Sequence, residues 1–154
     1  MYSRQEASKL RQEFWTKFGR FMAHHRSAEG RRVNWINYKT GVRQVFFRSQ
    51  ADSRKIYLGI EINHADDGIR ELFYEQFLEL KTYLHSLLEE EWTWEPVYFN
   101  ELDQPIARIY TEQSGLNVFE PDQWPEIMQF FKPRLLTLDE FWVDAKHTFL
   151  ALQN

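Results

Sequence analysis

The hydrophobic residues of this chain change their spacing along its length, from a helical period to a strand period and back. Apolar side chains recur every three or four residues from Leu10 to Met22, whereas residues 56–62 alternate between two faces. The helical spacing returns in residues 69–88 and in residues 124–152. Because a helix repeats every 3.6 residues and a strand every two, this pattern predicts helices at both ends of the chain, with strands and a further helix between them.

Five segments are expected to form strands. They are rich in β-branched and aromatic residues and comprise residues 33–38, 42–48, 56–62, 92–99 and 106–111. Short turns at residues 39–41 and 50–53 separate the first three, which predicts an antiparallel meander. The order α-βββ-α-ββ-α(α) predicts an α+β fold, with a five-stranded antiparallel sheet and helices packed mainly on one face.

Helix ends are also visible in the sequence. Ser3 followed by Glu6 has the spacing of a capping box, which predicts the start of the first helix. Pro133 lies inside the last helical segment and lacks the N–H that a helix interior requires. Thr137 and Glu140 offer a second capping box just beyond it. We therefore expect either two helices in line or one bent helix.

Length and composition favour a single domain over residues 1–154. The 17% aromatic content predicts a core rich in rings. The chain has no cysteine, which excludes disulfides, thiolate chemistry and cysteine-based zinc sites and suits a reducing cytoplasm. The N-terminal residues carry no apolar signal region, and no apolar run reaches the roughly 18 residues of a membrane span. We expect a cytoplasmic protein that does not enter the membrane.

Charge is divided unevenly along the chain. Residues 1–55 hold 13 Lys and Arg against 4 Asp and Glu, whereas residues 56–154 hold 6 against 19. Such asymmetry favours an anionic partner for the basic part, either nucleic acid or an acidic protein. It has a structural alternative, in which the two parts neutralise each other within one fold.

Seven basic residues form the candidate binding set for an anionic partner. They fall on or near the first three expected strands and are Arg31, Arg32, Lys39, Arg43, Arg48, Arg54 and Lys55. Lys and Arg neutralise phosphates, and an exposed Trp35 or Tyr38 would stack on bases. The alternative is a solvated surface that is partly paired with glutamates of the acidic helices.

Aromatic landmarks in a set order resemble a bacterial family known as a domain of unknown function. The landmarks are Phe14-Trp15, Trp35, residues 56–62, Phe73, Phe77, Lys81, Trp92-Thr93-Trp94-Glu95, Ala107-Arg108-Ile109 and Trp124-Pro125. The resemblance covers nearly the whole chain. It implies a bacterial protein whose relatives occur alone or appended to nuclease-like modules, and it implies no catalytic residues.

A metal-dependent phosphodiesterase is the alternative function. The expected order of helix, three strands, helix and strand is shared with restriction-endonuclease-like enzymes, which hold Mg²⁺ with carboxylates and use a nearby lysine. Glu61 and Asp52 are the candidate acids. However, Asn63 stands where the lysine would be, and residues 42–48 contain no acid. The sequence thus supplies an incomplete catalytic set.

One histidine lies within a cluster of acidic residues. His64, Asp66 and Asp67 follow the third expected strand, where a divalent ion is conceivable. Aspartates at a helix start also act as N-caps without any metal. We favour the cap and expect no metal and no cofactor.

Tryptophans suggest a third type of site. Trp92 and Trp94 would share one strand face and, with Trp124 and Trp142, would line a ligand pocket. Such rings more often form the core. We therefore expect a binding or interaction module rather than an enzyme, and the complementary charges of its two parts are also compatible with a homodimer.

Overall fold

The computed structural model describes residues 2–153, which form four helices, a short 3₁₀ helix and four strands. The helices are α1 (Arg4–Met22), α2 (Asp67–Glu79), α3 (Lys81–Leu88) and α4 (Trp124–Leu152), the strands are β1 (Val45–Ala51), β2 (Lys55–Ile62), β3 (Thr93–Phe99) and β4 (Pro105–Ser114), and the 3₁₀ helix η1 covers Pro121–Gln123. The α+β class is confirmed.

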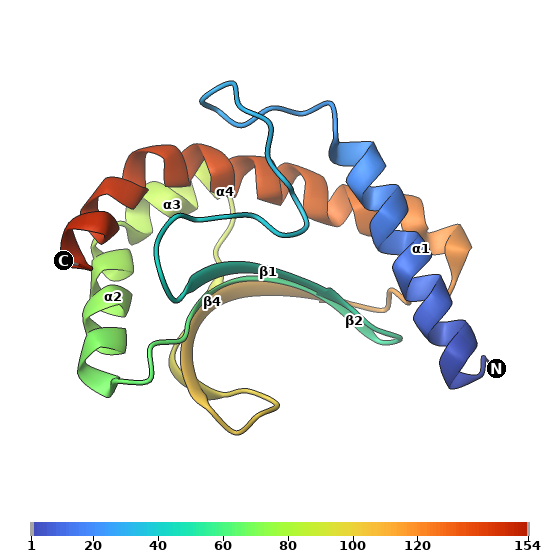
Figure 1. Ribbon diagram of the computed structural model, residues 1–154, viewed down its shortest axis with the longest axis horizontal. Coiled ribbons are helices and arrows are strands. Elements are labelled where there is room, and N and C mark those ends of the chain that lie inside the picture. The colour runs from blue at the N-terminus through green and yellow to red at the C-terminus, as the bar shows by residue number, and fades with distance from the viewer. Residues whose placement is uncertain (1, 154) are drawn as a thin grey trace.

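The strands form one antiparallel sheet in the order β1-β2-β4-β3. The long helix α4 arches over one side of the sheet, with α1 near one end of it and α2 and α3 near the other (Figure 1). The opposite side of the sheet is concave, and within residues 2–153 no helix covers it. The fold therefore has one covered sheet face and one open sheet face.

Side-chain alternation on β2 determines which face is covered. Ile56, Leu58, Ile60 and Ile62 are fully buried and pack in the main core with rings from α1, α2 and α4. Because side chains of a strand alternate between faces, the residues between these isoleucines and Leu58 belong to the open face.

The helix α1 begins as expected. The Ser3 hydroxyl accepts a hydrogen bond from the Glu6 amide at 3.1 Å, and the Glu6 side chain accepts one from the Ser3 amide at 3.4 Å. Phe14, Phe18 and Met22 form its buried stripe. The capping box and the apolar spacing predicted from the sequence are both confirmed.

The prediction of five strands is wrong, because residues 33–38 do not form a strand. The Asn34 side chain accepts hydrogen bonds from the amides of Ile36 and Asn37 and bends the backbone locally. The apolar residues of this segment still serve the core, since Trp35 is 3% exposed. Its hydrophobic pattern reflected burial in a loop rather than pairing in a sheet.

The sequence left open whether the second and the last helical segments are interrupted, and the structure decides both points. The apolar stripe over residues 69–88 is divided between α2 and α3, because the chain turns at Leu80, whose amide bonds to the Phe77 carbonyl at 2.9 Å. In contrast, α4 continues through Pro133 as one helix that curves over the sheet (Figure 1). The Thr137 hydroxyl donates to the Pro133 carbonyl at 2.8 Å, so it does not start a new helix.

Candidate functional site

The register of the sheet collects polar and aromatic side chains on its open face. Glu61 of β2 is directly opposite Arg108 of β4, which is in turn opposite Glu95 of β3. In the next row, Arg48 and Tyr110 flank Gly59 on either side. Directly opposite residues of neighbouring strands share a face, so charges and rings from all four strands meet here.

Gly59 makes room for the ring of Tyr57. A Cβ atom at position 59 would lie 2.3 Å from the Tyr57 hydroxyl oxygen, so the ring lies across the glycine. The hydroxyl thereby reaches Glu61 and donates to its Oε2 at 2.8 Å. Burial and the Glu61 carboxylate raise the pKa of Tyr57. The phenol therefore stays protonated and remains a hydrogen-bond donor.

Arg108 is held in a fixed position at the centre of this face. Its guanidinium binds Glu95 Oε1 through Nε at 2.9 Å and through Nη2 at 2.7 Å. The same group lies 3.4 Å from the ring centroid of Tyr98 and 4.0 Å from the ring centroid of Tyr110. Burial opposes its charge, but the interactions with Glu95 and Tyr57 outweigh burial and raise the pKa of Arg108. Arg108 forms part of the rigid floor of the site.

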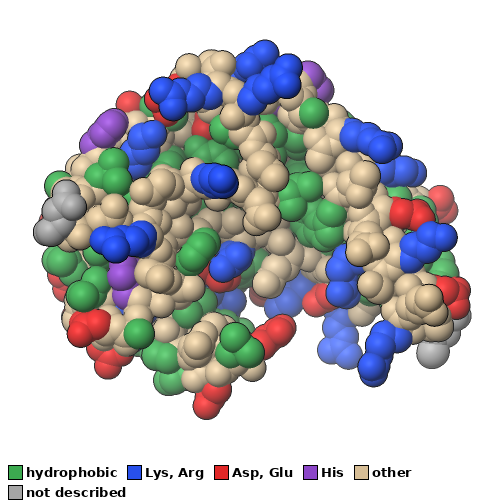
Figure 2. Space-filling model, viewed as in Figure 1, with side chains coloured by type: hydrophobic (Ala, Val, Ile, Leu, Met, Phe, Trp, Pro, Cys, Tyr) green, Lys and Arg blue, Asp and Glu red, His purple; other side chains and the backbone are tan. Residues whose placement is uncertain are grey.

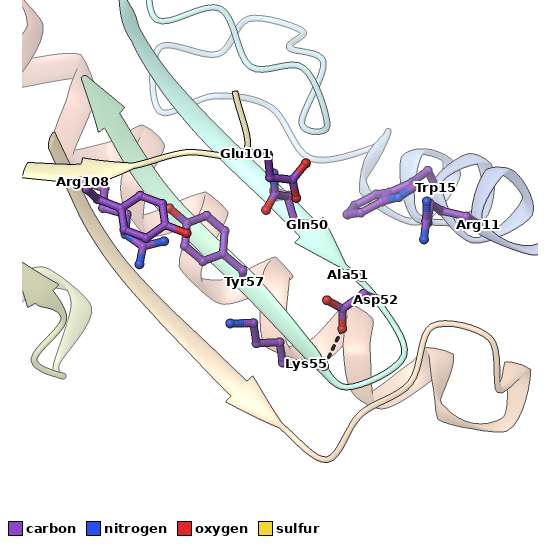
Figure 3. Close-up of a pocket in the computed structure, with 11 residues that line it drawn as sticks. Arg11, Trp15, Gln50, Ala51, Asp52, Lys55, Tyr57, Glu101 and Arg108 are labelled. Atoms are coloured by element: carbon purple, nitrogen blue, oxygen red, sulfur yellow. Dashed lines mark hydrogen bonds between the residues drawn. The ribbon is translucent and has the colours of Figure 1, made fainter. Parts of the chain in front are cut away.

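Two cavities extend from this floor. One, of about 410 Å³, lies between the sheet and α1, and Figure 3 shows Arg11 and Trp15 of α1 facing Gln50 and Asp52 across it. The other, of about 240 Å³, lies by the β3–β4 turn. Both cavities are lined by Gln50, Tyr57, Tyr98, Glu101 and Arg108. We call this continuous depression the sheet cleft.

The space-filling view shows the sheet cleft from the side. Figure 2 shows a hollow at the lower edge of the molecule, between the β3–β4 hairpin and the end of the sheet near α1. Lys and Arg side chains gather on the wall nearer α1, whereas Asp and Glu are more frequent on the hairpin side. The cleft therefore has one basic wall.

A second depression, of about 940 Å³, lies over the loop that precedes β1 and over the start of β1 itself. Its lining includes four of the predicted basic residues, Arg32, Lys39, Arg43 and Arg48. We call it the loop depression. Arg48 lines both the loop depression and the sheet cleft, so the two surfaces adjoin at this residue.

Buried hydrogen bonds hold the loop that carries these basic residues. Asp139 of α4 is 2% exposed and accepts hydrogen bonds from the Tyr38 hydroxyl and from the Ala28 amide, both at 2.6 Å. The Trp142 indole donates to the Thr40 carbonyl at 2.7 Å. Burial and the bond to Asp139 raise the pKa of Tyr38, so its hydroxyl remains a donor. The loop is thus a fixed platform although it contains no strand.

The structure brings five of the seven predicted basic residues to one surface. Four line the loop depression, and Lys55 lines the sheet cleft, where it is 3.0 Å from Glu112. Arg31 and Arg54 are exposed but line neither depression.

The basic part of the chain is largely unneutralised. Among the described residues, only Arg48 and Lys55 of the thirteen Lys and Arg in residues 1–55 form ion pairs, whereas four of the six in the remainder do. Mutual neutralisation within the fold therefore does not account for the charge asymmetry.

The two candidate acids of the phosphodiesterase alternative are not brought together. Asp52 closes the β1–β2 turn, where its Oδ1 accepts hydrogen bonds from the amides of Arg54 and Lys55. Asp52 lies opposite Lys55 across this turn, and Glu61 is six residues further along β2, about 20 Å away at 3.3 Å per residue. In residues 2–153, no group of three or more His, Asp or Glu side chains is arranged to hold a metal ion.

The other sequence candidates have structural roles. Asp66 caps α2 by accepting from the Ile69 amide, and Asp67 pairs with Arg70. The Trp124 indole donates to the Val118 carbonyl in the core.

The four tryptophans do not line a common pocket. Trp142 packs in the core against Phe47, Phe77 and Phe149, whereas Trp94 contacts His85 and Tyr74 beside β3. The Trp92 indole donates a hydrogen bond to Glu90, which also forms an ion pair with Arg134 of α4. The rings therefore stabilise different parts of the fold.

Several residues of the sheet cleft were not selected as candidates from the sequence. They are Arg11, Trp15, Gln50, Tyr57, Tyr98, Glu101 and Arg108. Alternation along β2 was the available signal for Tyr57, since it places this residue on the face opposite the buried isoleucines. The others come from separate elements, and no local pattern links them.

The fold and its surfaces define a class of protein: an α+β domain with one antiparallel sheet, covered by helices on one face and open on the other. Residues 10–146 match the family model described as "Domain of unknown function (DUF4268)", and the chain belongs to this family. No curated protein and no solved structure is significantly similar to it. None of the helices in residues 2–153 is long and apolar enough to cross a membrane.

Proposed function

We propose that this domain binds single-stranded nucleic acid along a surface that joins the loop depression to the sheet cleft. The cations of this surface, which we call the basic track, are Arg11, Arg32, Lys39, Arg43, Arg48 and Lys55. Arg32, Lys39 and Arg43 hold one end, Arg48 the middle, and Lys55 and Arg11 the other end. The domain acts as a binding module rather than as an enzyme.

The observation that carries this proposal is the unpaired state of the clustered cations. Within the described residues, Arg11, Arg32, Lys39 and Arg43 are exposed and have no carboxylate within ion-pair distance. Like charges gathered on one surface raise its potential and attract a polyanion. Binding phosphates releases the counterions of the nucleic acid, which favours association at low salt.

The size of the sheet cleft favours a single strand. Cavities of about 410 and 240 Å³ suit individual bases or nucleotides, whereas a base-paired duplex is too wide to enter them. Trp15 and Tyr98 offer aromatic surface at the cleft, and Gln50 and Glu101 offer hydrogen-bonding groups. Aromatic side chains beside a basic groove are typical of proteins that bind single strands without reading their sequence.

The length of the basic track matches a short oligonucleotide. β1 has seven residues and spans about 23 Å at 3.3 Å per residue. This length corresponds to several nucleotides, which is within the range that small single-strand-binding modules cover.

We also propose that the protein is cytoplasmic. Binding to single-stranded nucleic acid would suit the nuclease-like modules to which, as the family resemblance implies, related domains are appended.

The test is fluorescence anisotropy of labelled single-stranded and duplex oligonucleotides, of both DNA and RNA, at about 50 and 200 mM salt. We expect saturable binding that is tighter for single strands and weakens with salt. Replacing Arg32, Lys39 and Arg43 together by Ala removes three phosphate contacts. The slope of log K against log salt should then become shallower by about 2, at about 0.7 per phosphate.

A matched control has the same change in charge elsewhere. Arg4, Lys9 and Arg26 are also exposed and have no ion-pair partner among residues 2–153, but they line neither depression. Replacing these three by Ala should leave most of the affinity intact. Equal losses in both triple variants would show a diffuse effect of net charge. Absence of binding to every oligonucleotide at low salt would contradict the proposal, and binding to polyglutamate alone would instead identify an acidic protein as the partner.

A further inference from the structure

A groove between α2 and β3 lies apart from the basic track and has the opposite chemistry. It has a cavity of about 600 Å³ and shares no lining residue with the sheet cleft or the loop depression. We call it the acidic groove. Its defining residues are Glu71, Tyr74, Glu75 and Leu78 of α2 with Val97 and Phe99 of β3.

The acidic groove exposes three large apolar side chains. Leu78 is 40% exposed, Val97 54% and Phe99 58%. Single exposed apolar residues are ordinary on a protein surface, but several that face one groove indicate an interaction site.

The rim of the groove carries unpaired negative charge. Within residues 2–153, Glu71 and Glu75 have no cation within ion-pair distance, whereas the neighbouring Asp67 is paired with Arg70. Glu71 and Glu75 are four residues apart on α2, and like charges at this spacing repel each other and destabilise a helix. A cationic occupant would relieve this repulsion.

We propose that the acidic groove docks a basic amphipathic helix of a partner protein. An apolar floor with a charged rim is the pattern of grooves that receive the apolar face of a helix. The charge on the rim specifies Lys or Arg on the flanks of that helix.

Two other occupants fit less well. An added β-strand would pair with the edge of β3, but β3 contains Pro96 and a register shift between Glu95 and Tyr98, which interrupt its row of hydrogen-bonding groups. A symmetric dimer through this groove would bring Glu71 and Glu75 of both copies, four unpaired carboxylates, into one interface. A basic partner avoids both difficulties.

The test uses a labelled helical peptide of Lys and Leu with its Leu residues on one face. Two comparison peptides are a scrambled peptide of the same composition and an amphipathic peptide of Glu and Leu. We expect saturable anisotropy changes only with the amphipathic Lys and Leu peptide. Phe99→Ser should weaken its binding by about tenfold or more, as for a central apolar anchor.

Charge and control variants complete the test. Replacing Glu71 and Glu75 together by Gln should weaken binding several-fold and reduce its salt dependence. Leu102→Ser is the matched control, because Leu102 is 76% exposed and lies outside the groove. The triple Ala variant at Arg32, Lys39 and Arg43 should bind the peptide as the wild type does, which separates this proposal from the proposed nucleic-acid function.

Several outcomes would overturn the inference. Equal binding of the scrambled peptide would show unspecific attraction between charges, and binding unaffected by Phe99→Ser would place the peptide elsewhere. Failure of the amphipathic Lys and Leu peptide to bind would reject a basic helical occupant. Sedimentation that shows a wild-type dimer, dissociated by Phe99→Ser, would instead assign the groove to a second copy of the chain.

Discussion

Gly59→Ala should destabilise the protein although alanine is compatible with a strand at this position. The added Cβ atom would lie 2.3 Å from the hydroxyl oxygen and 2.7 Å from Cζ of Tyr57, and 3.0 Å from Cβ of Tyr110. Contacts this short force the Tyr57 ring to turn away. The floor of the sheet cleft would then lose both the ring packing and the hydrogen bond to Glu61.

The magnitude follows from these two losses. A hydrogen bond to a charged group contributes about 1.5–3 kcal/mol, and displacing a packed side chain costs about 1–3 kcal/mol. Replacing glycine reduces the freedom of the unfolded chain and returns about 0.4–1 kcal/mol. We therefore expect Gly59→Ala to lower the free energy of unfolding by about 3 kcal/mol, because Tyr57 is only 5% exposed and its ring stacks on that of Tyr110.

A double-mutant cycle isolates the clash. In a Tyr57→Val background the ring is absent and only the 3.0 Å approach to Tyr110 Cβ remains, so Gly59→Ala should lower the free energy of unfolding by no more than about 1 kcal/mol. The assay is urea unfolding followed by tryptophan fluorescence and circular dichroism, with m-values compared among the four proteins. A cost of Gly59→Ala that is the same in both backgrounds would show that Tyr57 is not what requires the glycine.

Three further predictions test other parts of the structure. Asp139→Ala removes the buried acceptor of Tyr38, so the free energy of unfolding measured in urea should fall by about 2–4 kcal/mol. Oligonucleotide binding should also weaken, because the loop that carries the basic residues loses its anchor. Unchanged binding would show that the loop needs no anchor. Folding raises the pKa values of Tyr38 and Tyr57, so the free energy of unfolding should be constant just below about pH 10 and should fall as the pH rises above it. Tyr57→Phe should reduce this fall, measured as the urea midpoint at a series of pH values. Burial opposes the charge of Glu90, but hydrogen bonds, chiefly from Arg134, outweigh burial and lower the pKa of Glu90. The wild type should therefore lose stability as the pH falls below about 4.5, and Glu90→Gln should lose less over the same range. Identical acid profiles of the two proteins would refute this.

Local patterns were sufficient for much of the secondary structure. The Ser3 capping box, the alternation in β2 and the repeat through α4 each depend on neighbours within a few residues. Residues 33–38 show where such patterns fail. Their apolar side chains predict a strand, but Asn34 binds the following amides and no neighbouring strand pairs with them.

The candidate site was less predictable than the fold. The basic residues were visible as a group because they are close together in the sequence, and Arg32, Lys39, Arg43 and Arg48 do share one depression. Arg108 was visible only as part of a family landmark, because its partners Glu95 and Tyr98 are brought to it by the pairing of β3 with β4.

The sequence by itself determined the α+β composition, the starts of α1 and α2 and the concentration of positive charge in residues 1–55. These features depend on side-chain type and on spacing within a turn or two of the backbone. Only the tertiary structure decided that the sheet has four strands, that one face stays open, and that most of the basic residues remain unpaired. These features depend on hydrogen bonds and contacts between residues far apart in the chain, such as Tyr38 with Asp139, whose geometry no local spacing encodes.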